Sequence, residues 1–441
     1  MTKVFAVTYG CQMNSYDTDQ MVKLLAQSHQ MSKTDVAEDA SCIIFNTCSI
    51  REKAAEKVFS DLGKYKQLKQ QRPELVIVVA GCVASQEGEA ITQRSDLVDI
   101  VIGPQTLHRL PELYTKALTA SAPIVDVSFA GQEKFDAINT KPLATRVSSY
   151  ISIMEGCSQF CSFCIVPYTR GAEISRRFDE VLKEAYLLSQ QGVKEITLLG
   201  QNVNRYQSVT ADDHPADLAL LIHYIASIDG IQSIRFTTSH PAYLDDGLID
   251  AFAEEPKLAD HFHLPVQSGS NRMLTAMKRG HDIQTFIDKV KRLRKARPGI
   301  TISSDFIVGF PGETEADFQE TMRLVTELKI DQSYSFIYSP RPNTPASELA
   351  DDVSLACKKK RLKRLQDRLD QNMQSINQTM LGQVYNILVT GRSKRDEHEL
   401  TGKTANNRVI NFEGSTDLIG HFVSVRVVAC NRYTLRGELT A

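Results

Sequence analysis

The sequence lacks an apolar run of the about 18 residues that a membrane-spanning helix needs, so such a helix is excluded. It also lacks an excess of charge of either sign: 51 basic and 53 acidic residues give a net charge of −2, which indicates nothing about an anionic partner. Residues 1–7 carry one positive charge and a very short apolar run, which is not typical of a signal peptide. With 42% hydrophobic residues, the composition is that of a globular protein and disfavours disorder, collagen and coiled coils.

The cysteine content is the informative part of the composition. The 441 residues contain nine cysteines, an odd number in a chain that shows no secretion signal. This count disfavours a disulfide framework and favours metal or redox chemistry in a reducing compartment. We therefore expect a cytoplasmic protein without a membrane partner. The length alone predicts two to four domains.

Three of the cysteines lie far apart in the sequence but share a context. Each follows a short apolar run that is typical of a buried strand, and each precedes a helical stretch. Alternating strands and helices predict a parallel sheet, whose carboxyl ends lie at one edge, where ligands bind. The three thiols are expected to converge there as metal ligands, although small buried cysteines also end strands by chance. They are Cys11, Cys48 and Cys82, after the predicted strands 4–7, 42–45 and 75–80 and before the predicted helices 17–28, 51–70 and 85–93.

Three further cysteines, Cys157, Cys161 and Cys164, form a tight C-x3-C-x2-C run. Three thiolates on one loop can bind three irons of a [4Fe–4S] cluster, which leaves the fourth iron open to a small molecule. Zinc is disfavoured because it needs a fourth Cys or His, and the next histidine is the distant His214. Cys42 lies within a predicted strand and is interpreted as a core residue, and Cys357 and Cys430 are assigned no role.

The tight run, with the aromatic Phe163 before its last cysteine, resembles the radical S-adenosylmethionine (SAM) superfamily. Three other segments resemble the methylthiotransferase family, and the resemblance covers essentially the whole chain without a departure at the six cysteine positions. The Ser-Ile-Arg-Glu-Lys segment after Cys48 resembles the members that act on tRNA rather than on a ribosomal protein. The three segments are Tyr9-Gly10-Cys11-Gln12-Met13-Asn14, Asn46-Thr47-Cys48-Ser49-Ile50-Arg51-Glu52-Lys53-Ala54 and Ala80-Gly81-Cys82.

An α/β chain of three domains is expected. Residues 1–120 are predicted to form a parallel α/β domain, and a stretch over 122–142 with proline and glycine is interpreted as a linker or crossover. Residues 143–375 are predicted to form an incomplete (β/α)6 TIM-like barrel, a fold that the resemblance also implies, with the cluster loop at the carboxyl end of its first strand. Residues 378–441 are predicted to form a small all-β barrel that resembles a TRAM domain, an RNA-binding module. The predicted barrel strands are 150–154, 195–199, 233–237, 261–266, 300–308 and 332–337.

The resemblance implies an enzyme that inserts sulfur and a methyl group at C2 of N6-isopentenyladenosine beside the tRNA anticodon. It implies two [4Fe–4S] clusters and two SAM molecules per turnover. The cluster on the tight run would generate a 5′-deoxyadenosyl radical, and that on Cys11, Cys48 and Cys82 would handle sulfur. The expected partners are the tRNA anticodon stem-loop and a reductant such as flavodoxin or ferredoxin; no sulfur donor and no further catalytic residue are assigned. The alternatives are threonylcarbamoyl-adenosine tRNA or a ribosomal aspartate as substrate, or a non-catalytic iron–sulfur protein that binds RNA or senses redox state.

Four side chains near strand ends are predicted SAM contacts. Phe163 is expected to pack against the adenine, although a core aromatic is an equal alternative. Gln201 and Asn202 follow the second predicted barrel strand, and Glu313 follows the fifth. The glycines in these segments are also typical of ordinary turns.

Basic side chains provide weaker indications. Arg170 is interpreted either as a contact to substrate phosphate or a carboxylate or as part of a structural salt bridge. The runs 289–297 and 358–368 are interpreted either as phosphate-binding faces or as solvated helix faces. A small excess of basic over acidic residues in the C-terminal domain indicates little by itself.

Overall fold

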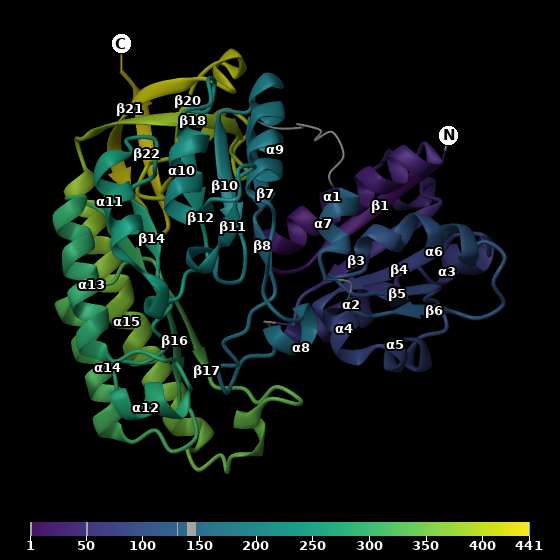
Figure 1. Ribbon diagram of the computed structural model, residues 1–441, viewed down its shortest axis with the longest axis horizontal. Helices are drawn as coiled ribbons and strands as arrows, with labels where there is room; N and C mark the ends of the chain where they lie inside the picture. The colour runs from purple at the N-terminus through teal and green to yellow at the C-terminus, as the bar shows by residue number, and fades with distance from the viewer. Residues whose placement is uncertain (1, 50–51, 130, 139–146, 441) are drawn as a thin grey trace. The chain divides into compact units, whose positions relative to one another are not determined.

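The computed structural model describes residues 2–49, 52–129, 131–138 and 147–440 (Figure 1). It divides into two compact units, and the chain crosses between them within the tight cysteine loop. The first unit consists of the described parts of Met1–Lys141, Met154–Gln159 and Ile165–Arg176, and the second of the described parts of Pro142–Ile153, Phe160–Cys164 and Arg177–Ala441.

The first unit is a parallel sheet with helices on both faces (Figure 1). Its strands, in the order β2-β1-β3-β4-β5-β6, are β1 (Lys3–Thr8), β2 (Ser32–Lys33), β3 (Cys42–Thr47), β4 (Val76–Gly81), β5 (Ile100–Ile102) and β6 (Ile124–Asp126). Its helices are α1 (Gln12–His29), α2 (Glu52–Gly63), α3 (Lys66–Gln71), α4 (Cys82–Glu87), α5 (Glu89–Arg94), α6 (Leu110–Ala117), α7 (Glu133–Ile138) and α8 (Val166–Arg170). A short antiparallel pair joins β8 (Met154–Glu155) to β9 (Ile174–Ser175).

Strand β3 shows why the central strands are continuously apolar. Successive side chains of a strand point to opposite faces, so Cys42 and Ile44 join the core beneath α1 and α6. Ile43 and Phe45 join the core beneath α2 on the other face. Because both faces are covered, neither set can be polar. The interpretation of Cys42 as a core residue is confirmed: it is fully buried, and burial raises the pKa of its thiol.

The predicted strands and helices around the three scattered cysteines are confirmed, with three changes. The single helices predicted over 51–70 and over 85–93 are each two helices, α2 with α3 and α4 with α5. Of the two interpretations of 122–142, linker or crossover, the linker does not fit the described residues, because β6 pairs with β5 and so extends the sheet beyond residue 120, and α7 follows it. Residues 50 and 51, inside the segment that indicated tRNA, and residues 139–146, at the end of the predicted linker, lie outside the described residues.

The second unit contains a partial barrel of parallel strands, most of which are labelled in Figure 1. Strand β10 (Glu195–Leu199) pairs with β7 (Ser148–Ser152) and β13 (Ser233–Phe236), β14 (His261–His263) with β15 (Thr301–Ser303), and β16 (Asp305–Val308) with β17 (Tyr334–Ile337). A small hairpin joins β11 (Gln207–Val209) to β12 (Pro215–Asp217). The helices are α9 (Phe178–Gln190), α10 (Leu218–Ala226), α11 (Asp246–Glu254), α12 (Asn271–Ala276), α13 (Ile283–Ala296), α14 (Glu315–Glu327) and α15 (Leu355–Met380). Among the described residues no pairing joins β17 to β7, so the barrel is incomplete, as predicted.

The strand predicted over 300–308 is two strands that separate at Ser304. The Ser304 hydroxyl donates to the Leu264 carbonyl at 2.9 Å and accepts from the Val266 amide at 3.0 Å. These side-chain bonds replace ladder bonds. Strand β15 therefore pairs on one side with β14, and β16 pairs on the other side with β17.

The C-terminal segment is a closed five-stranded barrel, which confirms the predicted all-β domain. In the order of pairing, its strands are β18 (Val384–Arg392), β19 (Glu399–Lys403), β20 (Val409–Glu413), β22 (Thr434–Leu439) and β21 (Phe422–Cys430). Inward-facing apolar side chains fill it, and Met380 at the end of α15 adds to this core. No helix in the described parts of the chain is both long and apolar enough to cross a bilayer.

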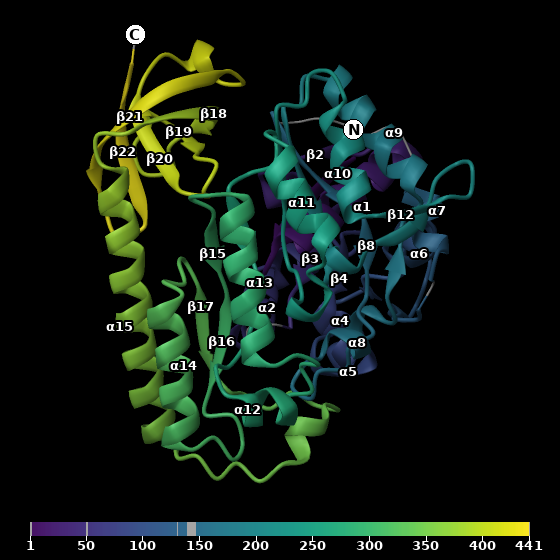
Figure 2. The same ribbon diagram turned by 60° about the vertical axis from the view of Figure 1, so that its left-hand side comes forward.

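A buried ion pair joins the C-terminal barrel to the partial barrel. Arg408 donates to Asp331 at 2.6 Å and to the Asn377 side chain at 2.6 Å, and the Arg408 and Asp331 side chains are each 1% exposed. Arg235 of β13 also donates to the Thr404 carbonyl at 3.0 Å. These polar contacts fix the small barrel at the end of α15 (Figure 2).

We expect Arg408→Met to lower the free energy of unfolding by about 3–5 kcal/mol, because Asp331 would remain buried without its partner. Guanidinium-induced unfolding of the full chain measures this change. The matched control is Arg432→Met, which removes an arginine from an exposed pair with Asp370 and should leave the unfolding midpoint unchanged. Equal midpoint shifts for both variants would contradict the expectation.

Candidate functional site

Three thiols of the first unit lie at one edge of its sheet. Strands β1, β3 and β4 are parallel neighbours, so their carboxyl ends meet at that edge. Cys11 immediately precedes α1, Cys48 directly follows β3, and Cys82 directly follows β4 as the first residue of α4. The predicted placement of these cysteines at strand ends is confirmed, and their use as metal ligands remains a prediction.

A direct interaction joins two of these thiols, Cys11 and Cys48. A hydrogen bond with Cys48 lowers the pKa of the Cys11 thiol to about 6, with help from the charge of Arg170 and against the effect of burial. A lowered pKa favours formation of the thiolate, the form that binds metals. Gly10 has a φ of +112°, and a Cβ built there would lie 2.7 Å from the Cys48 sulfur. The backbone of Gly10 thus closely approaches the Cys48 side chain.

Two fully buried asparagines, Asn14 and Asn46, hold the cysteine loops. The Asn14 amide donates to the Asn46 side chain at 3.1 Å and to the Thr47 carbonyl at 2.7 Å. The Asn14 oxygen also lies 3.3 Å from the Cys11 sulfur, which donates to it. Both asparagines belong to the segments that carry the family resemblance, but their structural role was not predicted. They connect the residue before Cys48 to the start of the helix that follows Cys11.

A buried ionic network borders the Cys82 sulfur. The Arg170 Nε lies 3.3 Å from that sulfur, and its two terminal nitrogens each lie 2.8 Å from a carboxylate, of Asp17 and of Glu155. Lys134 contacts the same two carboxylates, and all four charged side chains are at most 3% exposed. Burial disfavours the charged form of Asp17, but Lys134 and Arg170 hold its pKa below the ordinary value. Of the two interpretations of Arg170, the structural salt bridge is the one observed.

The donor set at this edge fits an iron–sulfur cluster with one open iron. It offers three thiols and a guanidinium that offsets negative charge. The described residues contain no group of three or more His, Cys, Asp or Glu side chains arranged around a single metal ion. Thiolates that bind different irons of one cluster do not need to share one metal ion.

We expect Gly10→Ala to eliminate iron binding at this set. An added Cβ would lie 2.3 Å from the Cys48 Cβ, and the left-handed backbone also disfavours alanine, so Cys48 must move. Iron content after anaerobic reconstitution should fall from about eight to about four atoms per chain if two [4Fe–4S] clusters bind. Gly63→Ala, at a glycine with open space around its Cα, is the matched control and should retain all the iron.

The tight cysteine loop has its members in both units: Cys157 lies in the first, and Cys161 and Cys164 lie in the second. The Cys157 amide donates to the Gly171 carbonyl at 3.1 Å. In the second unit, the Cys164 amide donates to the Cys161 carbonyl at 2.9 Å, and Arg279 Nη1 lies 3.3 Å from the Cys161 sulfur. Ser162 anchors this turn: its amide donates to the Met277 carbonyl at 3.0 Å, and its hydroxyl donates to the Ala276 carbonyl at 2.8 Å. Arg279 is 5% exposed, and no pattern in the sequence predicted that it would contact Cys161.

Phe163 is half-buried in an apolar cluster of the second unit. These contacts favour the interpretation of Phe163 as a core aromatic, and its contact with SAM remains a prediction. The cluster contains Met273, Met277, Ile307, Phe310, Tyr338 and Ala346.

Asn202 follows β10 and is 1% exposed, yet neither its amide nitrogen nor its oxygen has a hydrogen-bond partner among the described residues. The Ser239 hydroxyl and His240 Nε2, after the neighbouring strand β13, are likewise buried without a partner there. Burial lowers the pKa of His240 to about 2, so this side chain is neutral. Buried polar atoms normally have a partner, so these positions fit a polar ligand. Gln201 is half-buried at the same strand end.

Glu313 is engaged within the protein. Its carboxylate accepts from the Gly309 amide at 2.8 Å and from Arg361 at 2.8 Å, and its side chain is 1% exposed. Burial raises the pKa of this carboxyl, and the Arg361 charge acts in the opposite direction. Glu313 therefore holds the loop after β16 in place, and a direct contact with SAM remains a prediction.

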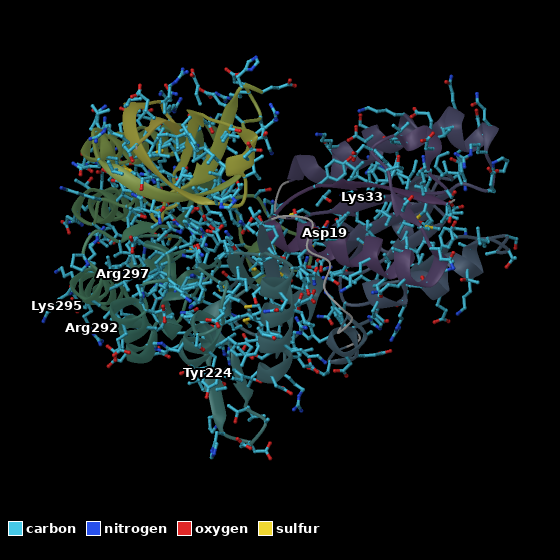
Figure 3. The ribbon with its side chains drawn as sticks, turned by 90° about the horizontal axis from the view of Figure 1, so that it is seen from above. Asp19, Lys33, Tyr224, Arg292, Lys295 and Arg297 are labelled. Carbon is cyan, nitrogen blue, oxygen red and sulfur yellow. The ribbon has the colours of Figure 1, made fainter. Side chains whose placement is uncertain are left out.

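Most side chains of the two basic runs have structural partners. Lys289 and Arg294 of α13, and Arg297 directly after it, donate to backbone carbonyls of neighbouring segments, and Arg292 pairs with Asp246. Figure 3 labels Arg292 and Lys295 of this helix and Arg297 at its end. On α15, most basic residues form ion pairs with carboxylates. The exposed side chains without such a partner among the described residues are Lys291, Lys295, Lys359 and Lys360.

Comparison with protein families finds three matches. The radical SAM superfamily matches residues 151–325, "Uncharacterized protein family UPF0004" matches residues 3–103, and the TRAM domain matches residues 378–440. The tRNA-2-methylthio-N(6)-dimethylallyladenosine synthase of Alkalilimnicola ehrlichii is 55% identical over 99% of this chain and 97% of its own length. The synthase of the same name from Coxiella burnetii (strain RSA 331 / Henzerling II) is 53% identical over 100% of both chains.

Solved structures resemble the chain at the level of the fold. The radical SAM methyltransferase TsrM of Kitasatospora setae, solved with cobalamin and a [4Fe-4S] cluster, gives a TM-score of 0.56 at 15% identity, over 79% of this chain and 77% of its own. The cobalamin-dependent SAM radical enzyme OxsB gives a TM-score of 0.51 at 14% identity, over 82% of this chain and 56% of its own. At these identities the likeness supports the α/β radical SAM fold alone.

Proposed function

This chain belongs to the family of tRNA-2-methylthio-N(6)-dimethylallyladenosine synthases, which are radical SAM enzymes, and on that premise we propose that it inserts sulfur and a methyl group at C2 of N6-isopentenyladenosine in tRNA. Membership of the radical SAM superfamily implies SAM and a [4Fe–4S] cluster, which together supply a radical able to take hydrogen from an unactivated aromatic C–H. Acid–base groups cannot do this at neutral pH.

We assign the cluster that cleaves SAM to Cys157, Cys161 and Cys164, and a second [4Fe–4S] cluster, for sulfur, to Cys11, Cys48 and Cys82. Two SAM molecules per turnover follow, one as methyl donor and one as radical source. The division into residues 1–120 for the second cluster, 143–375 for the radical core and 378–441 for RNA binding belongs to the same proposal. The observation that carries it is the convergence of three thiols at the sheet edge of the first unit.

The side chains have distinct tasks in this proposal. Asn14 and Asn46 orient the loops of Cys11 and Cys48 through their buried hydrogen bonds. Arg170 supplies positive charge beside Cys82. The unpartnered polar atoms of Asn202 and His240 would bind polar groups of SAM.

The proposed partners follow from this reaction. The substrate is a tRNA anticodon stem-loop that carries isopentenyladenosine, and the C-terminal TRAM domain supplies an RNA-binding module. A reductant such as flavodoxin or ferredoxin must deliver electrons to the tight-loop cluster. The reaction places the protein in the cytoplasm, with tRNA.

Nucleoside mass spectrometry of tRNA from cells that lack this protein tests the proposal. We expect isopentenyladenosine to accumulate and its 2-methylthio derivative to disappear. Expression of the wild-type chain should restore the derivative, and so should Cys357→Ala, which removes a cysteine without an assigned role. Unchanged 2-methylthio-isopentenyladenosine would contradict the proposal, and loss of the methylthio group from threonylcarbamoyl-adenosine instead would identify the alternative substrate.

A further inference from the structure

The guanidinium of Arg170 is divided among three acceptors. Its Nε lies 3.3 Å from the Cys82 sulfur, Nη1 lies 2.8 Å from Glu155, and Nη2 lies 2.8 Å from Asp17. Arg170 is 2% exposed and Cys82 is 7% exposed, so water does not compete strongly for these bonds. A planar fork with donors on three nitrogens is required for this arrangement, and lysine does not have one.

The backbone around Arg170 is also fixed. Arg170 ends α8, and its carbonyl accepts a hydrogen bond from the buried Gln105 side chain at 2.7 Å. The next residue, Gly171, has a φ of +76°, and its carbonyl accepts from the Cys157 amide at 3.1 Å. Arg170 therefore contacts the sulfur of Cys82 directly. The residue after it, Gly171, accepts a hydrogen bond from the amide of Cys157, which belongs to the tight cysteine loop.

Arg170 is not the only positive charge that neutralises the two carboxylates, because Lys134 contacts both of them. The network has two negative charges, on Asp17 and Glu155, and two positive charges, on Lys134 and Arg170, so it is balanced without any thiolate. Charge balance within the network therefore does not explain why Arg170 also contacts the Cys82 sulfur. Hydrogen bonds to the ligating sulfurs and nearby positive charge stabilise the reduced, more negative form of a cluster.

We propose that Arg170 is a positioning residue that donates a hydrogen bond to the Cys82 thiolate and thereby raises the reduction potential of the cluster held by Cys11, Cys48 and Cys82. This inference rests on the proposed function, which places a cluster at that set. Arg170 binds neither substrate nor SAM in this role. It orients one ligand and sets how readily the cluster accepts an electron.

The test uses the full chain with Cys157, Cys161 and Cys164 all replaced by alanine, so that any reconstituted iron belongs to the other set. A redox titration followed by electron paramagnetic resonance measures the cluster potential. In this background, Arg170→Met combined with Glu155→Gln removes one charge of each sign and keeps Asp17 paired with Lys134. We expect the equilibrium constant for reduction to fall about tenfold, which is about 59 mV for a one-electron couple.

Arg170→Lys provides the second measurement and keeps the positive charge. It should also lower the potential, because the positive charge remains but the hydrogen bond from Nε to the Cys82 sulfur is lost. If the double variant does not retain iron, the lysine variant decides the question. Glu155→Gln alone is the control for the carboxylate and should not lower the potential.

The possible failures are distinct. Absence of iron in the background with an intact Arg170 would contradict the second cluster, and hence the proposed function. An iron-loaded cluster whose potential is the same with arginine and lysine at position 170 would overturn the role of Arg170 alone. The same comparison is made at the tight loop, where Arg279 lies beside Cys161. In a chain that lacks Cys11, Cys48 and Cys82, the reduction potential of the remaining cluster with Arg279→Lys shows whether an arginine beside sulfur has the same effect at both cysteine sets.

Discussion

Replacing Cys161 with alanine is expected to reduce cleavage of SAM to the level measured without protein. Cys161 is 6% exposed, its sulfur accepts a hydrogen bond from Arg279, and the adjacent Ser162 is anchored on both its backbone and its side chain. Two cysteines would remain in the loop, which is too few for a stable three-cysteine cluster site.

The measurement is 5′-deoxyadenosine formed under anaerobic conditions with SAM and a chemical reductant. Cys357→Ala is the control, because Cys357 lies on α15 and has no assigned role. It should form 5′-deoxyadenosine at the wild-type rate. Formation at that rate by Cys161→Ala would contradict the assignment of the tight loop.

Replacing Cys48 with alanine is expected to separate the two activities. Cleavage of SAM should continue, while formation of the 2-methylthio nucleoside should fall to background. The reason is that Cys48, 2% exposed, directly follows β3 and interacts with Cys11 in the first unit. Its loss removes one thiol from the sulfur-handling set and none from the tight loop. Both products are quantified in the same reaction with tRNA that carries isopentenyladenosine.

Cys42→Ala is a matched control for Cys48→Ala, since Cys42 begins the strand that Cys48 directly follows but is buried in the apolar core. Both activities should persist in that variant. Loss of 5′-deoxyadenosine in Cys48→Ala as well as in Cys161→Ala would contradict the division of tasks between the two cysteine sets.

Much of the fold was predictable because its signals are local. Apolar runs such as that of β3 alternate with amphipathic helices, and a parallel sheet follows from that alternation. The positions of Cys11, Cys48 and Cys82 were predictable for the same reason, since each lies just beyond a strand end. β6 was missed because it is a strand of three residues at the sheet edge, flanked by Pro123 and other turn-forming residues.

The surroundings of the cysteines were not predictable from one sequence. Arg170 contacts Cys82 across 88 residues and Asp17 across 153 residues of sequence. No spacing rule connects such partners, and a buried arginine has the same appearance in a sequence as an exposed one. The roles of the basic runs were similarly hidden, because charge does not indicate that Lys289 or Arg294 binds a backbone carbonyl.

The central claim is methylthiolation with two uses of SAM, and a single product balance tests it most directly. The anaerobically reconstituted chain is incubated with SAM, a reductant, inorganic sulfide as the source of sulfur, and tRNA that carries isopentenyladenosine. 5′-Deoxyadenosine, S-adenosylhomocysteine and the 2-methylthio nucleoside are then quantified by mass spectrometry. The account predicts equal amounts of the three products. The 2-methylthio nucleoside without S-adenosylhomocysteine, or 5′-deoxyadenosine with the adenosine left unmodified, would contradict it.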